Sequence, residues 1–139
     1  MKNNEITESQ KQKAFEAVKT IPYVQLIGME LVDLSGGEAI FKLKMREQLR
    51  QPHGLLHGGA TASIIDTAMA FAVVTCLAED EKASTVDLTV HYLRPLVEGT
   101  ITCTAKVVKA GKRLLTVSAQ VVNDEEKLIA TALSTYSKV

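Results

Sequence analysis

The sequence has little of what marks nucleic-acid-binding or membrane-surface proteins. It has no tryptophan, and aromatic residues make up only 4% of its 139 residues, so a base-stacking surface is not expected. The 16 basic residues are balanced by 16 acidic ones, which leaves no net charge to attract nucleic acid or anionic lipid. We therefore expect neither a nucleic-acid partner nor a membrane partner.

Cysteine and metal-binding patterns are also scarce. The 2 cysteines, Cys76 and Cys103, form no CxxC motif and lie in apolar stretches, so we expect buried thiols in a reducing compartment. The N-terminus lacks an apolar signal core, which favours a cytoplasmic location. The 3 histidines show no HxH or HxxxH spacing, so no metal site is predicted.

One apolar stretch, residues 59–78, could be mistaken for a transmembrane helix. Its single charge is Asp66, and a carboxylate at mid-bilayer would cost about 2.5–3.5 kcal/mol. The stretch therefore predicts a buried helix in a water-soluble protein.

What is present is an ordered alternation of helix and strand signals. The length of 139 residues suits one domain, and a hydrophobic fraction of 46% is ordinary for a globular protein. We expect an N-terminal helical segment over residues 1–21 and a core over residues 22–139. Thr7 and Gln10 form a capping-box pattern that opens a helix to about Lys19, and Pro22 stops it. Apolar–polar alternation predicts strands over 38–46, 86–92, 101–107 and 115–121. The mixed segment 29–35 and the final segment 127–137 are also expected to be strands, and the apolar helix is expected over 57–78.

One apolar helix beside short-linked strands indicates an α+β fold, in which a curved antiparallel β-sheet wraps around the helix. The sheet's other face and its edges would still need cover, so we expect an oligomer.

The glycine pair Gly58-Gly59 stands at the mouth of the apolar helix. The first turn of a helix has free N–H groups and the positive end of the helix dipole, which are the parts of an oxyanion hole. Glycines that merely ease a tight loop entry are the alternative interpretation.

Asp66 is the only charge between His57 and Ala78. A carboxylate at an apolar surface is costly unless it is paired or used, so Asp66 is either a general base, a nucleophile, or a structural group bonded to a local hydroxyl such as Ser63. Gly58 and Asp66 lie about 12 Å apart along one helix, too far to reach one carbonyl. A shared site would therefore be built from two chains.

His57-Gly58-Gly59 followed by Asp66 resembles the hotdog-fold acyl-CoA thioesterases of the phenylacetate-degradation and 4-hydroxybenzoyl-CoA types, over about residues 22–138. The resemblance implies that the N–H of Gly58 polarises the thioester carbonyl and that Asp66 attacks it or directs water. It also implies supporting roles: Gln51 positions the thioester or water, His57 supports the thioester end of the site, and Thr85 holds the water.

The sequence mixes the two types. Gln51 is similar to the Gln/Glu type, which includes enzymes of menaquinone synthesis that cleave a naphthoyl-CoA, whereas Asp66 is similar to the Asn/Asp type. Whether Asp66 acts as a nucleophile or as a general base stays open, and so does the identity of the acyl group. Because coenzyme A carries anionic phosphates, the resemblance implies a basic rim, for which the candidates are Arg94, Lys112 and Arg113. The alternative is that these are ordinary exposed charges at turns. Gly59 is a further substrate-binding candidate.

The resulting hypothesis is an acyl-CoA thioesterase that needs no cofactor, because coenzyme A is part of its substrate. It would be a homo-oligomer, a dimer of hotdog subunits forming a tetramer. One alternative is a non-catalytic acyl-CoA-binding module, although only about 20 residues precede the fold, too few for a DNA-binding domain. The other is a hotdog dehydratase acting on 3-hydroxyacyl thioesters, whose histidine–acid pair lies in a different local motif.

Overall fold

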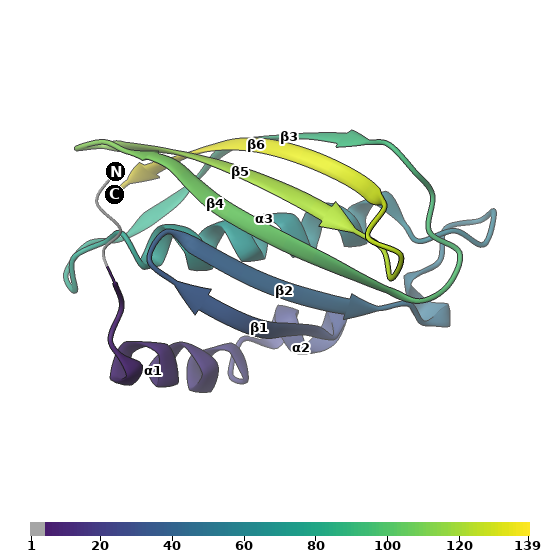
Figure 1. The fold of residues 1–139 in the computed structure, drawn as a ribbon, viewed down its shortest axis with the longest axis horizontal. Coiled ribbons are helices and arrows are strands. Elements are labelled where there is room, and N and C mark those ends of the chain that lie inside the picture. The colour runs from purple at the N-terminus through teal and green to yellow at the C-terminus, as the bar shows by residue number, and fades with distance from the viewer. Residues whose placement is uncertain (1–4) are drawn as a thin grey trace.

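Six antiparallel strands curve around one long helix in the computed structural model of the chain (Figure 1). The structure describes residues 5–139, so residues 1–4 of the predicted segment 1–21 lie outside it. The elements, in chain order, are α1 Glu8–Val18, α2 Pro22–Ile27, β1 Met29–Ser35, β2 Glu38–Lys44, the 3₁₀ turn η1 Glu47–Leu49, α3 Gly58–Val74, β3 Ala83–Tyr92, β4 Thr100–Ala110, β5 Leu114–Val122 and β6 Leu128–Lys138.

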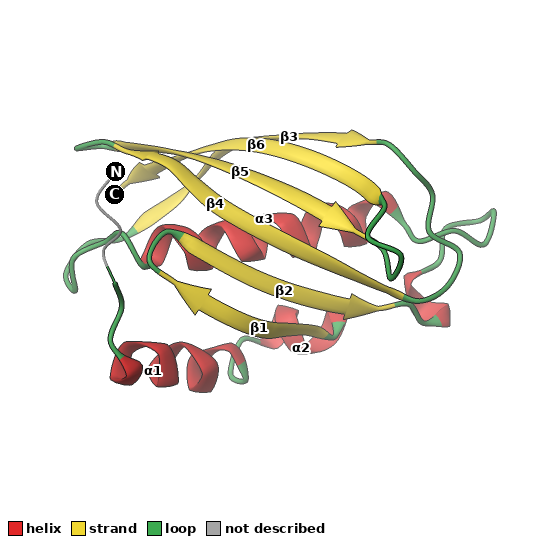
Figure 2. Cartoon of the chain, in the orientation of Figure 1, coloured by secondary structure: helices red, strands yellow, loops and turns green. Residues whose placement is uncertain are grey.

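The strand order in the sheet is β1-β2-β4-β5-β6-β3, and every neighbouring pair is antiparallel. Helix α3 contacts all six strands and lies behind the sheet in Figure 2, while α1 and α2 lie beside β1. This confirms the predicted α+β hotdog fold, a curved antiparallel sheet around one central helix. The assignment of residues 1–139 to one domain stays a prediction.

The core forms between α3 and the inner face of the sheet. Small residues of α3 let the backbones approach closely, and Ile64, Ile65 and Met69 are fully buried between them. Phe71 of α3 meets Phe41 of β2 edge to face, with ring centroids 5.2 Å apart. The apolar character of the helix is thus explained by burial, and among residues 5–139 no helix is both long and apolar enough to cross a membrane.

The predicted end of this helix at Ala78 is wrong, since α3 ends at Val74. The hydroxyl of Thr75 donates to the carbonyl oxygen of Ala72 at 2.7 Å and accepts the N–H of Gly37 at 2.7 Å. The N–H of Cys76 then bonds only three residues back, to Val73. Side-chain capping and this tighter turn tie the helix end to the β1–β2 turn, a contact that apolar periodicity does not report.

The N-terminal region confirms the capping box and corrects the expected role of Pro22. Thr7 Oγ1 accepts the N–H of Gln10, and Gln10 Oε1 accepts the N–H of Thr7. Pro22 does more than stop α1, because it stands at the first position of α2, where its missing N–H costs nothing. The guanidinium of Arg46 then donates to the last carbonyls of α2, a long-range cap that the sequence pattern could not reveal.

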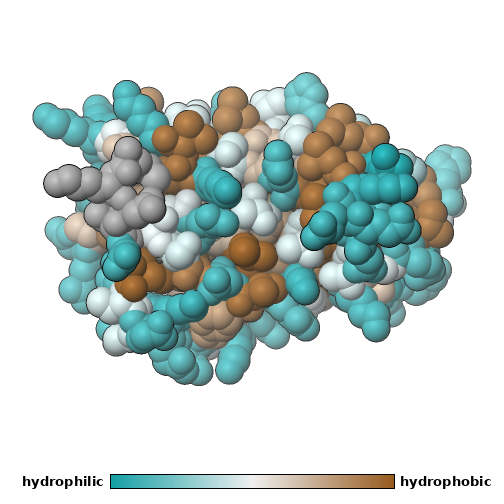
Figure 3. All heavy atoms as spheres, viewed as in Figure 1, coloured by the Kyte–Doolittle hydropathy of each residue, from teal (hydrophilic) through white to brown (hydrophobic). Residues whose placement is uncertain are grey.

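The two edges of the sheet differ. The edge strand β1 is flanked by α1 and α2, whereas the other edge, along β3, has no strand beside it in the described chain. In the view of Figure 3, apolar side chains form several separate groups, and hydrophilic side chains lie between these groups. Among residues 5–139, the backbone groups on the outer edge of β3 are therefore left without a strand partner.

Candidate active site

The first turn of α3 leaves one backbone donor open. His57 is the N-cap, and its ring Nδ1 accepts the N–H of Gly59 at 2.8 Å, so that nitrogen carries no proton. The carbonyl oxygen of His57 accepts the N–H of Ala60 at 2.9 Å. Among residues 5–139, the N–H of Gly58 has no hydrogen-bond partner. Gly58 can thus donate to a ligand, whereas the N–H of Gly59 is occupied by the cap.

Gly58 lines a pocket of about 370 Å³ together with Gln51, Tyr92 and Arg94. The hydroxyl of Tyr92 donates to the carbonyl oxygen of Gly58 at 2.8 Å. Its ring carbons would lie 3.3 Å from a Cβ placed on Gly58, so this close packing favours glycine at position 58. Gln51 Oε1 accepts the N–H of His53, which leaves the NH₂ group of Gln51 available to a ligand.

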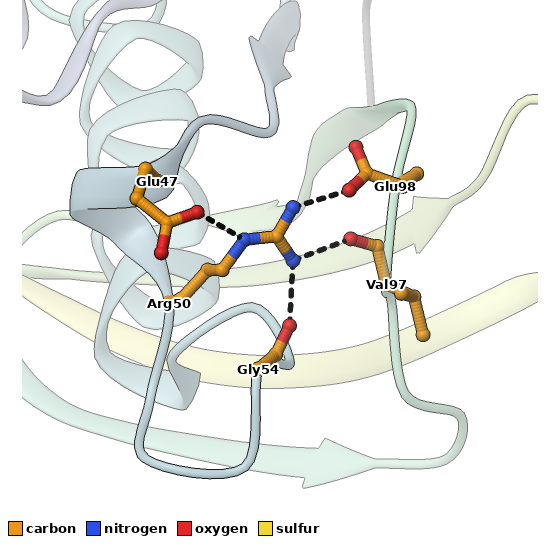
Figure 4. Close-up of polar contacts among 5 residues, drawn as sticks. All are labelled: Glu47, Arg50, Gly54, Val97 and Glu98. Carbon is orange, nitrogen blue, oxygen red and sulfur yellow. Dashed lines mark hydrogen bonds and ion pairs between the residues drawn. The ribbon is translucent and has the colours of Figure 1, made fainter.

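The loop that carries Gln51 is held by the guanidinium of Arg50 (Figure 4). Arg50 Nη1 donates to the carbonyl oxygens of Gly54 at 2.6 Å and Val97 at 2.8 Å. Its Nε bonds Glu47 at 2.9 Å, and its Nη2 bonds Glu98. One side chain thus fixes the loop before α3 to the loop before β4, and the planar fork of arginine is suited to such multiple contacts.

The second candidate group, Asp66, lies in a cluster of hydroxyls. Its Oδ1 accepts the hydroxyls of Thr85 at 2.9 Å and Tyr136 at 2.8 Å, while Oδ2 has no partner among the described residues. Burial raises the pKa of Tyr136, so its hydroxyl stays protonated and can donate. The alternative of a bond from Ser63 is wrong, because Ser63 donates to the carbonyl oxygen of Gly59 at 2.8 Å instead.

Strand β3 lies along α3 and reaches both regions. At its end, Tyr92 contacts Gly58, and near its start, Thr85 contacts Asp66. Asp66 is not part of the lining of the Gly58 pocket, and about 12 Å of helix separates the two residues. A single chain therefore presents two half-sites, which we call the Gly58 half-site (Gly58, Gln51, Tyr92 and Arg94) and the Asp66 half-site (Asp66, Thr85 and Tyr136).

The predicted basic residues are divided between the two ends of the molecule. Arg94 lines the Gly58 pocket. Lys112 and Arg113 lie in the turn between β4 and β5, at the opposite end of β4 from the loop that Arg50 holds (Figure 1). At about 3.3 Å per residue, a strand of that length spans roughly 35 Å, so one chain does not bring these two residues to its own pocket.

Sequence reasoning did not single out two residues of these half-sites, Tyr92 and Tyr136, nor the role of Arg50 in holding the loop that carries Gln51. Each tyrosine lies in a predicted strand, and a buried tyrosine hydroxyl usually finds a hydrogen-bond partner. That signal marks Tyr136 as a donor, but the partner depends on how β6 lies against α3. Among residues 5–139, no three His, Cys, Asp or Glu side chains come together as metal ligands would.

Comparison with known proteins adds independent information. The thioesterase superfamily matches residues 53–130. The acyl-coenzyme A thioesterase PaaI of Escherichia coli is 30% identical, covering 75% of this chain and 73% of that protein, and the 1,4-dihydroxy-2-naphthoyl-CoA hydrolase of Listeria monocytogenes is 26% identical, covering 81% and 92%.

Solved structures agree with the sequence matches. The structure of E. coli PaaI aligns with a TM-score of 0.84 at 26% identity, covering 92% of this chain and 91% of that one. The conserved protein PA5202 of Pseudomonas aeruginosa aligns with a TM-score of 0.82 at 33% identity, covering 86% and 94%. The likeness thus extends over most of the chain, and the family match over residues 53–130 includes helix α3 with Gly58 and Asp66.

Proposed function

The chain belongs to the thioesterase superfamily and is a thioester hydrolase, and we propose that it cleaves an acyl-CoA with Gly58 and Asp66 as its catalytic groups. The observation that carries this proposal is a pair of unsatisfied atoms: the N–H of Gly58 and Oδ2 of Asp66 have no partner within the described chain. An open donor and an open carboxylate oxygen are what thioester hydrolysis requires.

In the proposed reaction, the N–H of Gly58 donates to the carbonyl oxygen of the thioester as that oxygen gains negative charge. The carboxylate of Asp66 then acts in one of two ways. As a general base, it takes a proton from water while the water oxygen bonds to the carbonyl carbon; as a nucleophile, it attacks that carbon and water later cleaves the anhydride. In both routes the C–S bond breaks, and the leaving thiolate takes up a proton to give free coenzyme A.

We further propose that one reacting carbonyl meets Gly58 of one subunit and Asp66 of another. The edge of β3 is open, and Val86 on this strand is 61% exposed. Two antiparallel β3 strands around a two-fold axis would place the start of one strand beside the end of the other. Because Thr85 lies near the start of β3 and Tyr92 at its end, this pairing brings together the two half-sites of different chains.

The same pairing favours shared binding of coenzyme A. The turn that holds Lys112 and Arg113 lies at the end of the molecule opposite the Gly58 pocket, so the partner's turn would approach that pocket. Lys112 and Arg113 of one chain and Arg94 of the other would then face the anionic phosphates. We also propose that two such dimers form a tetramer and that catalysis needs no cofactor. A cytoplasmic location would suit the two free cysteines.

The deciding experiment measures release of free thiol from aryl-, medium- and long-chain acyl-CoAs by the wild type and by Asp66→Asn. We expect turnover by the wild type on one acyl class and a loss in kcat of about 10²–10⁴ in the variant, the range for a missing general base. Asp80→Asn, in the exposed turn after α3, is the matched control and should retain full activity.

Three outcomes would contradict the proposal. Thermal stabilisation by an acyl-CoA without turnover would indicate a binding module. Formation of an enoyl thioester without thiol release would indicate a dehydratase. Unchanged hydrolysis by Asp66→Asn would leave the thioesterase activity standing but remove Asp66 from its mechanism.

A further inference from the structure

Tyr136 makes contacts that the proposed reaction does not by itself explain. It is a strand residue of β6 and is 2% exposed, yet its hydroxyl reaches across to the middle of α3. There it donates to Asp66 Oδ1 at 2.8 Å and lies 2.9 Å from the carbonyl oxygen of Asp66. One hydroxyl thus contacts both the side chain and the main chain of the same residue, which restrains the carboxylate relative to the helix.

The two oxygens of the Asp66 carboxylate have different surroundings as a result. Oδ1 accepts two hydroxyls, from Tyr136 and from Thr85, whereas Oδ2 accepts none among residues 5–139. A carboxylate with one oxygen held by two donors cannot rotate about its last bond without losing both of them. The geometry therefore fixes which oxygen is exposed to a reactant.

Among residues 5–139, the Asp66 carboxylate is bonded by hydroxyl groups and by no charged side chain. On β3, Asp87 instead accepts the N–H of Thr135 at 2.8 Å, and on β6, Lys138 pairs with Glu81 at 2.9 Å. The residues of β2 and β4 that face α3 are apolar, and β5 has no charged residue. His91 lies in the later half of β3, toward the Gly58 end, and forms no hydrogen bond with Asp66.

We infer that Tyr136 is a positioning residue, which together with Thr85 fixes the Asp66 carboxylate so that Oδ2 is the oxygen that acts in thioester cleavage. This inference rests on the proposed role of Asp66. Tyr136 itself does not touch the substrate, and its effect is transmitted entirely through the carboxylate. Its contribution should therefore vanish when the carboxylate is absent.

The test is a double-mutant cycle of Tyr136→Phe and Asp66→Asn, with kcat and KM measured by thiol release. Phenylalanine keeps the buried ring and removes only the hydroxyl. We expect Tyr136→Phe to lower kcat about tenfold with little change in KM, the effect of one hydrogen bond to a charged group, and to have no effect in the Asp66→Asn background. Tyr23→Phe is the matched control, because the Tyr23 hydroxyl bonds Ser63 of the same helix and forms no hydrogen bond with the Asp66 carboxylate.

Two further measurements separate positioning from folding. Thr85→Val removes the other donor at an exposed position of β3, and it should lower kcat in the same carboxylate-dependent way. The hydroxyl proton of Tyr136 should be visible by NMR in the wild type, be absent in Tyr136→Phe and shift in Asp66→Asn. This last readout reports the contact without depending on activity.

The outcomes are distinct. Unchanged kcat in Tyr136→Phe, or an equal loss in both backgrounds, would overturn the inference while Asp66→Asn still shows that Asp66 is catalytic. Absence of turnover by the wild type would instead overturn the proposed function, and the inference with it. A loss of kcat on Tyr136→Phe only when Asp66 is present would support both the inference and the proposed function.

Discussion

The Gly58 half-site and the Asp66 half-site lie on the same helix, yet they are organised by different means. The Gly58 half-site offers a backbone N–H, and its surroundings are loops that Arg50 holds together. The Asp66 half-site offers a carboxylate in the middle of α3, held by hydroxyls from two strands. The first depends on where a loop lies and the second on strand register, so substitutions should affect the two in recognisably different ways.

The largest effect that distinguishes them is expected at Gly58. In Gly58→Ala, the new Cβ would lie 3.3 Å from the ring of Tyr92, so the helix start or the ring must shift. Because the oxyanion donor moves with the helix start, we expect kcat to fall about 10²-fold, the lower range for loss of such a donor. Ala62→Gly, later in the same helix, is a control that weakens the helix by about 1 kcal/mol without touching the donor. If both variants lose activity equally, the effect comes from stability.

The two-subunit site is tested by mixing Gly58→Ala with Asp66→Asn after joint refolding. Half of the dimers formed at random would be mixed, and each mixed dimer would contain one intact site and one doubly altered site. About a quarter of the wild-type activity should therefore return, as expected when each site takes one half from each chain. A site built within one chain would show no recovery.

A smaller effect is expected at Arg50, which holds the loop of the Gly58 half-site. Arg50→Lys keeps the charge but cannot reproduce the forked contacts to Gly54, Val97 and Glu98, so Gln51 should become less well placed. We expect kcat/KM to fall about fivefold, together with a lower melting temperature. Glu47→Gln removes only the exposed pair with Arg50 and should change neither quantity. Equal effects of both variants would show that the fork itself is unimportant.

The smallest effect is expected at the turn between β4 and β5. Replacing Lys112 and Arg113 by alanine should raise KM for an acyl-CoA about threefold, since exposed charges that meet phosphates contribute modestly. KM for an acyl-pantetheine, which lacks the nucleotide phosphates, should not change. The same comparison for Arg94→Ala tells whether both ends of the molecule contribute. Equal KM changes for the two substrates would mean that the turn does not contact the nucleotide.

Much of the fold could be predicted because the relevant signals are local. The capping box at Thr7 and Gln10 and the alternation along β4 and β5 are short-range patterns, and they appear in the structure as predicted. The exceptions have long-range causes. The end of α3 depends on the Gly37–Thr75 contact, and the unpredicted helix α2 is capped by Arg46 from beyond β2.

The sequence by itself determined that a buried helix begins near Gly58, that it carries one carboxylate, and that these two groups are too far apart along the helix to share a carbonyl within one chain. Helix pitch, capping and hydrophobic periodicity depend on neighbouring residues, so they can be predicted from the order of residues alone. Only the tertiary structure decided that Asp66 meets Thr85 and Tyr136, which are 19 and 70 residues away along the chain. Such partners depend on strand register and on the curvature of the whole sheet around α3, and these are set by the packed core.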